Sequence, residues 1–344
     1  MREIAEFRIP EGNAARFLSK QDGKKIGMAV RMVRAEVGSA LYNRIGELEQ
    51  RFYKKKDPFF LGWDIQRDYT KKELSDATLL HLVITSTFEP AGELCGTIYD
   101  DSSVCPYCKV GRKQTSDLFL DLRKLPKGKD IARTIADEWV ISQRLAQFFL
   151  EHQITGFELR PVRHKAYYMG DAIDMRQLET GRNLIKLAEQ QGCHYPDWAF
   201  WVWINRPEQA ELCQQMEQEY SSKQASKEMR TSKKYPKWYQ LIVTSKPVSV
   251  SNQTRFGINP FINDERGEYR CPNNHLGGLN LLSEIIVQEG SWDGSDIVQT
   301  DKFVGTRRGL LTPAPLLLVS QRLYRLFQSE NVKGCKFEVA YSIL

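Results

Sequence analysis

The chain repeats one of its own segments, and this repeat constrains the fold more than any other feature. Residues 141–162 read ISQRLAQFFLEHQITGFELRPV, and residues 319–340 read VSQRLYRLFQSENVKGCKFEVA. In both segments a serine precedes an apolar stripe at helical spacing, and a glycine follows that stripe. Beyond the glycine, apolar and polar residues alternate as in a strand with one buried face. Each segment therefore predicts a helix capped by Ser142 or Ser320 that leads into a strand.

The similarity extends upstream of the helix. Residues 82–86 (LVITS) resemble residues 241–245 (LIVTS), and both read as a strand followed by a turn. A cysteine-bearing turn comes next in each copy, at residues 105–108 (CPYC) in the first and at residues 271–275 (CPNNH) in the second. We therefore interpret the chain as containing an internal duplication.

A further strand follows the turn, and its partner in the second copy is ambiguous. Residues 116–120 (SDLFL) resemble both residues 283–287 (SEIIV) and residues 295–298 (SDIV). Either choice gives each copy the order strand, Cys turn, strand, strand, helix, strand. This order predicts an α+β fold with two related units.

The repeat divides the chain into three regions. Residues 1–162 hold an N-terminal α/β segment and the first unit, residues 163–237 form a helical connector with a polar arm, and residues 238–344 form the second unit. Within these regions, the spacing of apolar residues in Lys25–Val37 predicts a helix. The aromatic run Trp198–Trp203 predicts a buried strand, and the alternative is an adhesive aromatic surface.

Composition places the chain among ordinary globular proteins. Of its 344 residues, 41% are hydrophobic and 27% are charged, and the formal net charge is +6. The N-terminus carries no apolar leader, and no apolar run reaches the length of a membrane span. We therefore expect a cytoplasmic protein with no membrane partner, in which seven cysteines serve as thiols or metal ligands.

The first cysteine turn predicts a structural zinc site. A Cys-Pro-x-Cys turn presents two thiolates at the separation that tetrahedral zinc requires. Cys105 and Cys108 form this turn, and Cys95 is the candidate third ligand. Free thiols in a tight turn are the alternative interpretation of the same residues.

The fourth zinc ligand stays open at this point. The candidates by residue type are His81, His164, Cys271 and His275. Cys271 and His275 occupy the cysteine turn of the second copy. Either that copy has lost its metal, or these two residues complete the site of the first copy across a shared interface.

Acid–base catalysis has no clear candidates. The acidic pairs, such as Asp100–Asp101 and Asp264–Glu265, lie beside residues typical of solvated turns. The five histidines show no recognised catalytic spacing, and a cysteine-rich zinc shell is typical of structural sites. We therefore expect a protein that is not an enzyme.

The first copy resembles a known family. The resemblance rests on the cysteine turn, on residues 116–119 (SDLF), and on the ending that runs from ISQRL at residues 141–145 to ITGFEL at residues 154–159. It is similar to the bacterial immunity-protein-like family of polymorphic toxin loci, often called double-CxxCG proteins. Two features depart from that pattern, because Lys109 follows the CxxC and a second CxxC is absent. The resemblance implies a folded surface that occludes a partner toxin, and it implies no catalytic residues.

These observations predict a non-catalytic protein-binding protein. An immunity- or antitoxin-like role, in which the chain neutralises or docks a partner protein in a bacterial conflict system, is the leading hypothesis. The net positive charge favours an acidic or neutral partner. The alternative is a nucleic-acid-binding zinc module in bacterial defence or regulation, which would use Trp238 and the lysines within residues 54–56 and 223–237.

Overall fold

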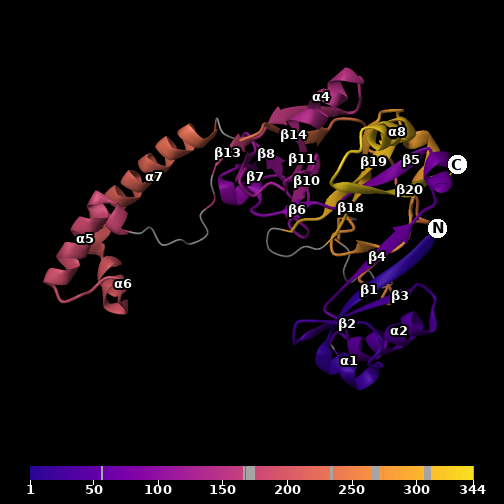
Figure 1. Cartoon of the computed structure of the whole chain (residues 1–344), viewed down its shortest axis with the longest axis horizontal. Coiled ribbons are helices and arrows are strands. Elements are labelled where there is room, and N and C mark those ends of the chain that lie inside the picture. The colour runs from indigo at the N-terminus through magenta and orange to yellow at the C-terminus, as the bar shows by residue number, and fades with distance from the viewer. Residues whose placement is uncertain are drawn as a thin grey trace.

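The computed structural model describes residues 1–55, 57–165, 167, 175–232, 235–264, 271–273, 275–305 and 311–343, except for the side chains of residues 221 and 224–232. Helices and strands combine in mixed sheets, which confirms the α+β class. Figure 1 shows a body that contains the sheets and a helical extension that projects from it.

The N-terminal segment forms a sheet of its own. Its strands follow the order β2-β3-β1-β4, and all pairs are antiparallel. The elements are β1 (Arg2–Pro10), α1 (Glu11–Phe17), β2 (Lys24–Ile26), β3 (Val30–Glu36), α2 (Ala40–Tyr53) and β4 (Gly62–Asp68). Phe7, Ile45 and Phe59 belong to one fully buried core between this sheet and its helices.

The prediction of a helix over Lys25–Val37 is wrong. This stretch forms the hairpin of β2 and β3. Val33 and Ala35 alternate with exposed residues along β3 and point into the core, so tertiary pairing with β1 overrides the weak helical spacing.

Two five-stranded sheets make up the rest of the body. The first has the order β12-β14-β11-β10-β6, and the second has the order β17-β20-β5-β19-β18. The strands of the first are β6 (Thr87–Phe88), β10 (Ile131–Thr134), β11 (Trp139–Ser142), β12 (Phe157–Pro161) and β14 (Trp238–Val243). The strands of the second are β5 (Leu79–Ile84), β17 (Ile285–Gln288), β18 (Ile297–Val304), β19 (Ala314–Ser320) and β20 (Cys335–Ile343).

Each sheet contains one strand from the other half of the chain. β5, from the N-terminal half, pairs with β19 and β20. β14, from the C-terminal half, pairs with β11 and β12. Each sheet therefore contains strands from both sides of the predicted boundaries at residues 162 and 238. The strand that begins each repeat, β5 (LVITS) or β14 (LIVTS), lies in the sheet of the other half.

Two capped helices cover these sheets together. In α4 (Gln143–Glu151) the Ser142 hydroxyl accepts a hydrogen bond from the Leu145 N–H, and in α8 (Gln321–Ser329) Ser320 accepts one from Leu323. Both predicted N-caps are thus confirmed. The apolar faces of α4 and α8 meet in one core cluster, and Figure 1 shows the two helices near each other at the same end of the body.

Matching contacts tie the halves together at the ends of these helices. Gly156 and Gly334 both have positive φ, 91° and 110°. A Cβ on Gly156 would lie 2.2 Å from the Ile297 carbonyl oxygen, and one on Gly334 would lie 2.2 Å from that of Ile131. The prediction that these glycines end the helices is wrong, because α4 ends at its C-cap His152 and α8 at Glu330, and the left-handed residues that follow are Gln153 and Asn331. Each glycine instead lies directly before the next strand and admits a strand of the opposite half.

Hydrogen bonds distinguish the two segments that resemble residues 116–120. In the first half, the Thr97 hydroxyl exchanges hydrogen bonds with the backbone of Phe119, in β9 (Phe119–Leu120). In the second half, the Thr254 hydroxyl does the same with Ile286, in β17. Of the two candidate segments, residues 283–287 therefore make the same contact as residues 116–120.

The connector forms the helical extension. It consists of η2 (Met175–Gln177), α5 (Glu179–Gln190), α6 (Trp198–Ile204), η3 (Pro207–Gln209) and α7 (Ala210–Ser232). The predicted buried strand at residues 198–203 is wrong, because α6 is a helix in which only one face, with Phe200 and Trp203, is buried. The polar arm is the end of α7 as far as Ser232, and residues 233 and 234 lie outside the described residues.

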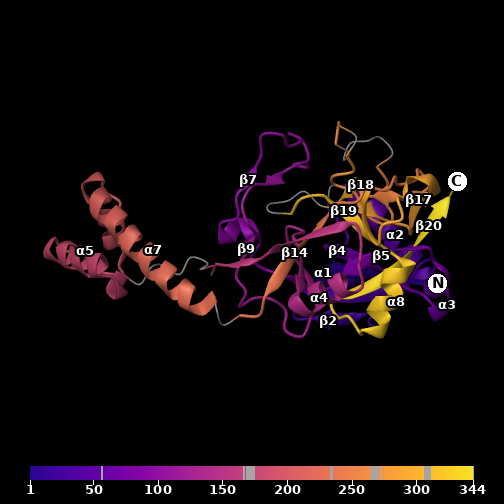
Figure 2. The same cartoon turned by 90° about the horizontal axis from the view of Figure 1, so that it is seen from above.

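Short elements complete the body. They are α3 (Lys71–Asp76), η1 (Gly92–Cys95), β7 (Tyr99–Asp100), β8 (Lys113–Gln114), β13 (Arg163–His164), β15 (Phe256–Gly257), β16 (Asn280–Leu281) and η4 (Glu289–Ser291). Figure 2 shows the loop that follows β7 on the side of the sheets away from α4 and α8. Among the helices of the described residues, none combines the length and the apolar composition of a membrane span.

Candidate metal centre

Four side chains from the two halves of the chain meet at one point. They are Cys105, Cys108, Cys271 and His275, and their ligand atoms all lie within 4.8 Å of one another. Cys105 Sγ is 3.3 Å from Cys271 Sγ, and Cys108 Sγ is 3.1 Å from His275 Nδ1. The halves therefore contribute two ligands each.

The first pair of ligands comes from a tight turn between β7 and β8. The Cys105 N–H donates to the Val110 carbonyl oxygen at 2.8 Å, and the Lys109 N–H donates to the Cys105 carbonyl oxygen at 2.9 Å. Lys109 has a φ of 60°, in the left-handed region. This backbone path turns both thiols to the same side.

The second pair comes from a matching turn before β16. The Cys271 N–H donates to the His275 carbonyl oxygen at 3.1 Å, which brings the thiol and the imidazole together. The Asn273 amide nitrogen lies 3.3 Å from Cys105 Sγ and donates to it across the boundary between the halves. A Cβ on Gly277 would lie 2.8 Å from the Cβ of Cys108, so the absence of a side chain there lets the two turns approach.

The centre is closed to solvent on its sulfur side. Cys108 is fully buried, and Cys105 and Cys271 are only 5% and 6% exposed. Phe303 packs against this cluster, with its ring centroid 6.1 Å from that of His275. His275 itself is half-buried.

The thiols are in different electrostatic states. Burial would raise the pKa of Cys105, but backbone N–H groups of Cys108 and Tyr107 and the neighbouring thiols lower it to about 6. Burial raises the pKa of Cys108 to about 12; the Val110 N–H opposes this shift, and the adjacent sulfurs of Cys105 and Cys271 add to it. A bound cation would remove this conflict, because it stabilises several thiolates at once.

The donor set fits a tetrahedral metal ion. Thiolates bound at about 2.3 Å to zinc lie about 3.8 Å apart at the corners of a tetrahedron. The separations in this centre, from 3.1 Å to within 4.8 Å, span that value. Three sulfurs and one imidazole nitrogen are a donor set typical of structural zinc, and they occupy four positions. The group can therefore hold a metal ion, and its chemistry is compatible with zinc.

The structure brings together two of the three predicted ligands. Cys105 and Cys108 belong to the group, and Cys271 and His275 accompany them, as one of the open alternatives proposed. Cys95 is not a member of this four-residue group. It lies at the end of η1, where burial raises the pKa of its thiol to about 11.

The other two candidate ligands lie elsewhere. His164 is in β13, and its Nδ1 accepts a hydrogen bond from the Leu122 N–H. His81 is in β5, and its Nδ1 lies 3.8 Å from Glu338. Cys271 and His275 could have been chosen from the sequence by their position. Their Cys-x₃-His turn occupies the same place in the second segment as the Cys-x₂-Cys turn in the first.

The structure describes only some of the basic residues that the nucleic-acid-binding hypothesis would use. Lys54 and Lys55 follow α2 and are exposed, whereas Lys56 lies outside the described residues. Lys223 is bound to Glu219 on α7 at 2.5 Å, and most of the lysine side chains that follow it lie outside the described residues. Trp238 is buried in β14, so it does not offer a surface for base stacking.

Comparison with known proteins gives no relative from which a role could be transferred. No family model, curated protein or solved structure matches this chain.

Proposed function

We propose that this protein is a zinc-clamped, non-catalytic protein-binding protein with an immunity- or antitoxin-like role. The observation that carries the proposal is the closed metal centre, in which both halves of the chain supply two ligands. A zinc ion with four protein ligands has no open position for water or substrate. Its role is then to hold two parts of a binding scaffold in a fixed arrangement.

An internal duplication would explain the scaffold. The matched helix caps, glycines and cysteine turns all occur in the same order in the two halves. Because β5 and β14 are exchanged between the sheets, neither half can complete its sheet alone. We interpret the chain as two fused copies of one unit, intertwined and clamped by zinc.

The helical extension supports a binding role. Trp198 on α6 is 81% exposed, and Trp201 and Val202 beside it are 37% and 43% exposed. A large aromatic residue in water has a hydrophobic cost, and exposed apolar clusters are typical of protein interaction sites.

The zinc assignment is tested by elemental analysis of the purified protein. We expect about one zinc per chain, and loss of that zinc in Cys271→Ser as well as in Cys105→Ser. Cys95→Ser is the matched control, because Cys95 is buried outside the centre, and it should retain zinc. Metal-free protein that remains folded would overturn the assignment.

The binding role is tested with proteins encoded next to this gene. Each neighbouring open reading frame is co-expressed with the full chain, and complex formation and rescue of growth from toxicity are measured. We expect a stoichiometric complex that persists as salt is raised, since a packed interface depends little on charge screening. Nucleic-acid binding that weakens steeply with salt, without a protein complex, would favour the zinc-module alternative instead.

A further inference from the structure

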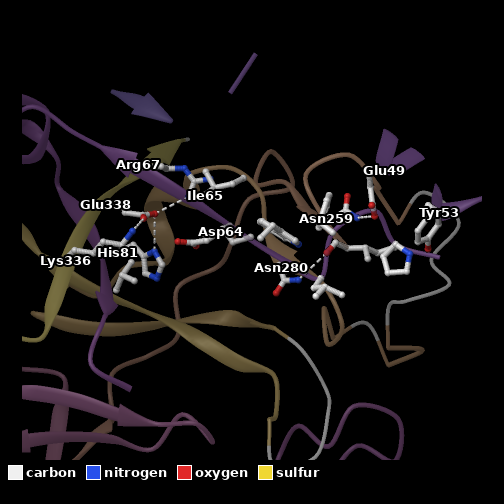
Figure 3. Close-up of a pocket in the computed structure, with 18 residues that line it drawn as sticks. Glu49, Tyr53, Asp64, Ile65, Arg67, His81, Asn259, Asn280, Lys336 and Glu338 are labelled. Atoms are coloured by element: carbon white, nitrogen blue, oxygen red, sulfur yellow. Dashed lines mark hydrogen bonds and ion pairs between the residues drawn. The ribbon is translucent and has the colours of Figure 1, made fainter. Parts of the chain in front are cut away.

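A cavity of about 660 Å³ lies between the N-terminal sheet and the second five-stranded sheet. Its size falls within the range of about 300–1,000 Å³ typical of ligand sites. One wall is β4, and the other walls come from β5, β20 and the segments around Asn259 and Asn280. Figure 3 shows residues of these elements facing the same space.

The wall formed by β4 is an open sheet edge. β4 pairs with β1, and no other described strand pairs with it. The Val37 N–H donates to the Glu3 carbonyl oxygen. From Glu3 onward, the backbone N–H and C=O groups of every second residue of β1 therefore point to β3, and those of the residues between them point to β4. The register of β1 with β4 then directs the backbone groups of Trp63, Ile65 and Arg67 away from β1. These three residues all line the cavity.

A buried guanidinium has a free donor at the same place. The Arg67 side chain is only 3% exposed. Its Nε donates to Glu3 at 2.8 Å and its Nη1 to Glu338 at 3.2 Å, but Nη2 has no hydrogen-bond partner among the described residues. His81 Nδ1 nearby is also buried without such a partner. A buried donor such as Arg67 Nη2 is costly unless a ligand supplies an acceptor.

The charges around Arg67 argue against an anionic ligand. The positive charges of Arg67 and Lys336 are already matched by Glu3 and Glu338. Asp64 adds a further carboxylate beside them, and Figure 3 shows it between the Arg67–Glu338 group and the Glu49–Asn259 pair. A neutral acceptor such as a peptide carbonyl satisfies the free donor without a charge conflict.

We propose that this cavity binds an extended, uncharged segment of a partner protein, which adds as a strand to the open edge of β4. Three outward positions at alternate residues correspond to a segment of about five residues. Main-chain groups pair with Trp63, Ile65 and Arg67, and one carbonyl accepts from Arg67 Nη2. Apolar side chains of the segment contact Leu61, Val83 and Leu281, which also line the cavity. This inference rests on the proposed protein-binding role and names its contact surface.

The test uses random twelve-residue peptides displayed on phage and selected on the full-length zinc-loaded protein. The most enriched peptide is synthesised and titrated by calorimetry. Amide exchange is then followed by NMR in the free and the bound protein. We expect the amides of Trp63, Ile65 and Arg67 to exchange fast in the free protein and to become protected on binding. The neighbouring amides of Asp64 and Gln66, which face β1, should be protected in both states.

Matched variants separate the free donor from general charge. Arg67→Lys keeps a cation beside Glu338 but removes the guanidinium fork, and we expect at least a tenfold loss of peptide affinity. Arg2→Lys makes the same change at a side chain that is 61% exposed on the same sheet, and it should bind like the original protein. Thermal unfolding and zinc content check that both variants are folded.

Three results would overturn the inference. They are the absence of any enriched peptide, enrichment of acidic peptides alone, and protection at another surface such as α6. The proposed function fails separately. If a neighbouring protein forms a complex that leaves the β4 amides unprotected, the binding role stands and the β4 site is refuted.

Discussion

Phe149 and Phe327 stack on each other in the core that α4 and α8 share, with ring centroids 5.9 Å apart and planes inclined by 20°. Each ring lies on the buried face of its own helix, α4 or α8. They occupy the same place in the two repeated segments. The repeated sequence therefore meets itself in one core rather than forming two separate ones.

This contact makes the two halves depend on each other for stability. We expect Phe149→Ala and Phe327→Ala each to lower the free energy of unfolding by about 3–5 kcal/mol, as large buried aromatics do. Because the rings touch, the double variant should lose less than the sum of the two. Urea unfolding measures all three. Leu150→Ala, at a neighbouring side chain that is 69% exposed, is the control and should change stability little. Additive losses would show that the halves are independent.

Removal of the metal should separate the two cysteine turns. The ligands come from residues far apart in the sequence, so a bound zinc ion would close a long loop and would stabilise the folded state by binding it selectively. We expect a strong chelator to lower the melting temperature and to increase amide exchange in residues 101–112. Cys95→Ser protein should respond to the chelator as the unmodified protein does. An unchanged melting curve would argue that the turns hold together without metal.

Gly277 should control the geometry of the metal centre. Any side chain there would approach Cys108 Cβ to 2.8 Å and Pro313 Cγ to 2.9 Å, so Gly277→Ala must displace the Cys108 turn. We expect at least a tenfold weaker zinc affinity in a competition titration with a chromophoric chelator. Gly290→Ala is the matched control, because a Cβ there meets nothing within 4 Å. Equal affinities would mean that the turns tolerate a shift.

Glu338 should make part of the stability depend on acid pH. Its side chain is 6% exposed, and burial alone would raise its pKa. Contacts with His81, Lys336 and Arg67 outweigh burial and lower the pKa from 4.5 to about 2. The folded state thus prefers the carboxylate, and this contribution is present above pH 4.5 and is lost as the pH falls towards 2. The shift corresponds to about 3 kcal/mol.

Unfolding in urea between pH 3 and pH 7 checks this prediction. Glu338→Gln should be less stable at neutral pH, because Arg67 loses its charged partner, and its stability should fall less steeply as the pH drops. The exposed Glu289→Gln should leave the profile unchanged. A Glu338→Gln profile parallel to that of the unmodified protein would contradict the assignment.

Local sequence predicted the parts of the fold that depend on neighbouring residues. Sequence predicted the caps at Ser142 and Ser320 and the apolar stripes that follow them. A helix forms its backbone hydrogen bonds within itself and needs only one apolar face, so a short segment is enough to recognise it. The same reasoning failed for residues 198–203. An aromatic run that is apolar on all sides has no distinct period, and its burial on one face of α6 depends on packing with α5.

By itself, the sequence determined the α+β class, the repeated helix-to-strand unit and the two cysteine turns, because each is encoded within a few consecutive residues. Only the tertiary structure decided that β5 and β14 are exchanged, that Cys271 and His275 rather than Cys95 join Cys105 and Cys108, and that β4 leaves an open edge. These features depend on which distant segments pack together. No local sequence pattern predicts which distant segments pack together, since their packing depends on the free energy of the whole core.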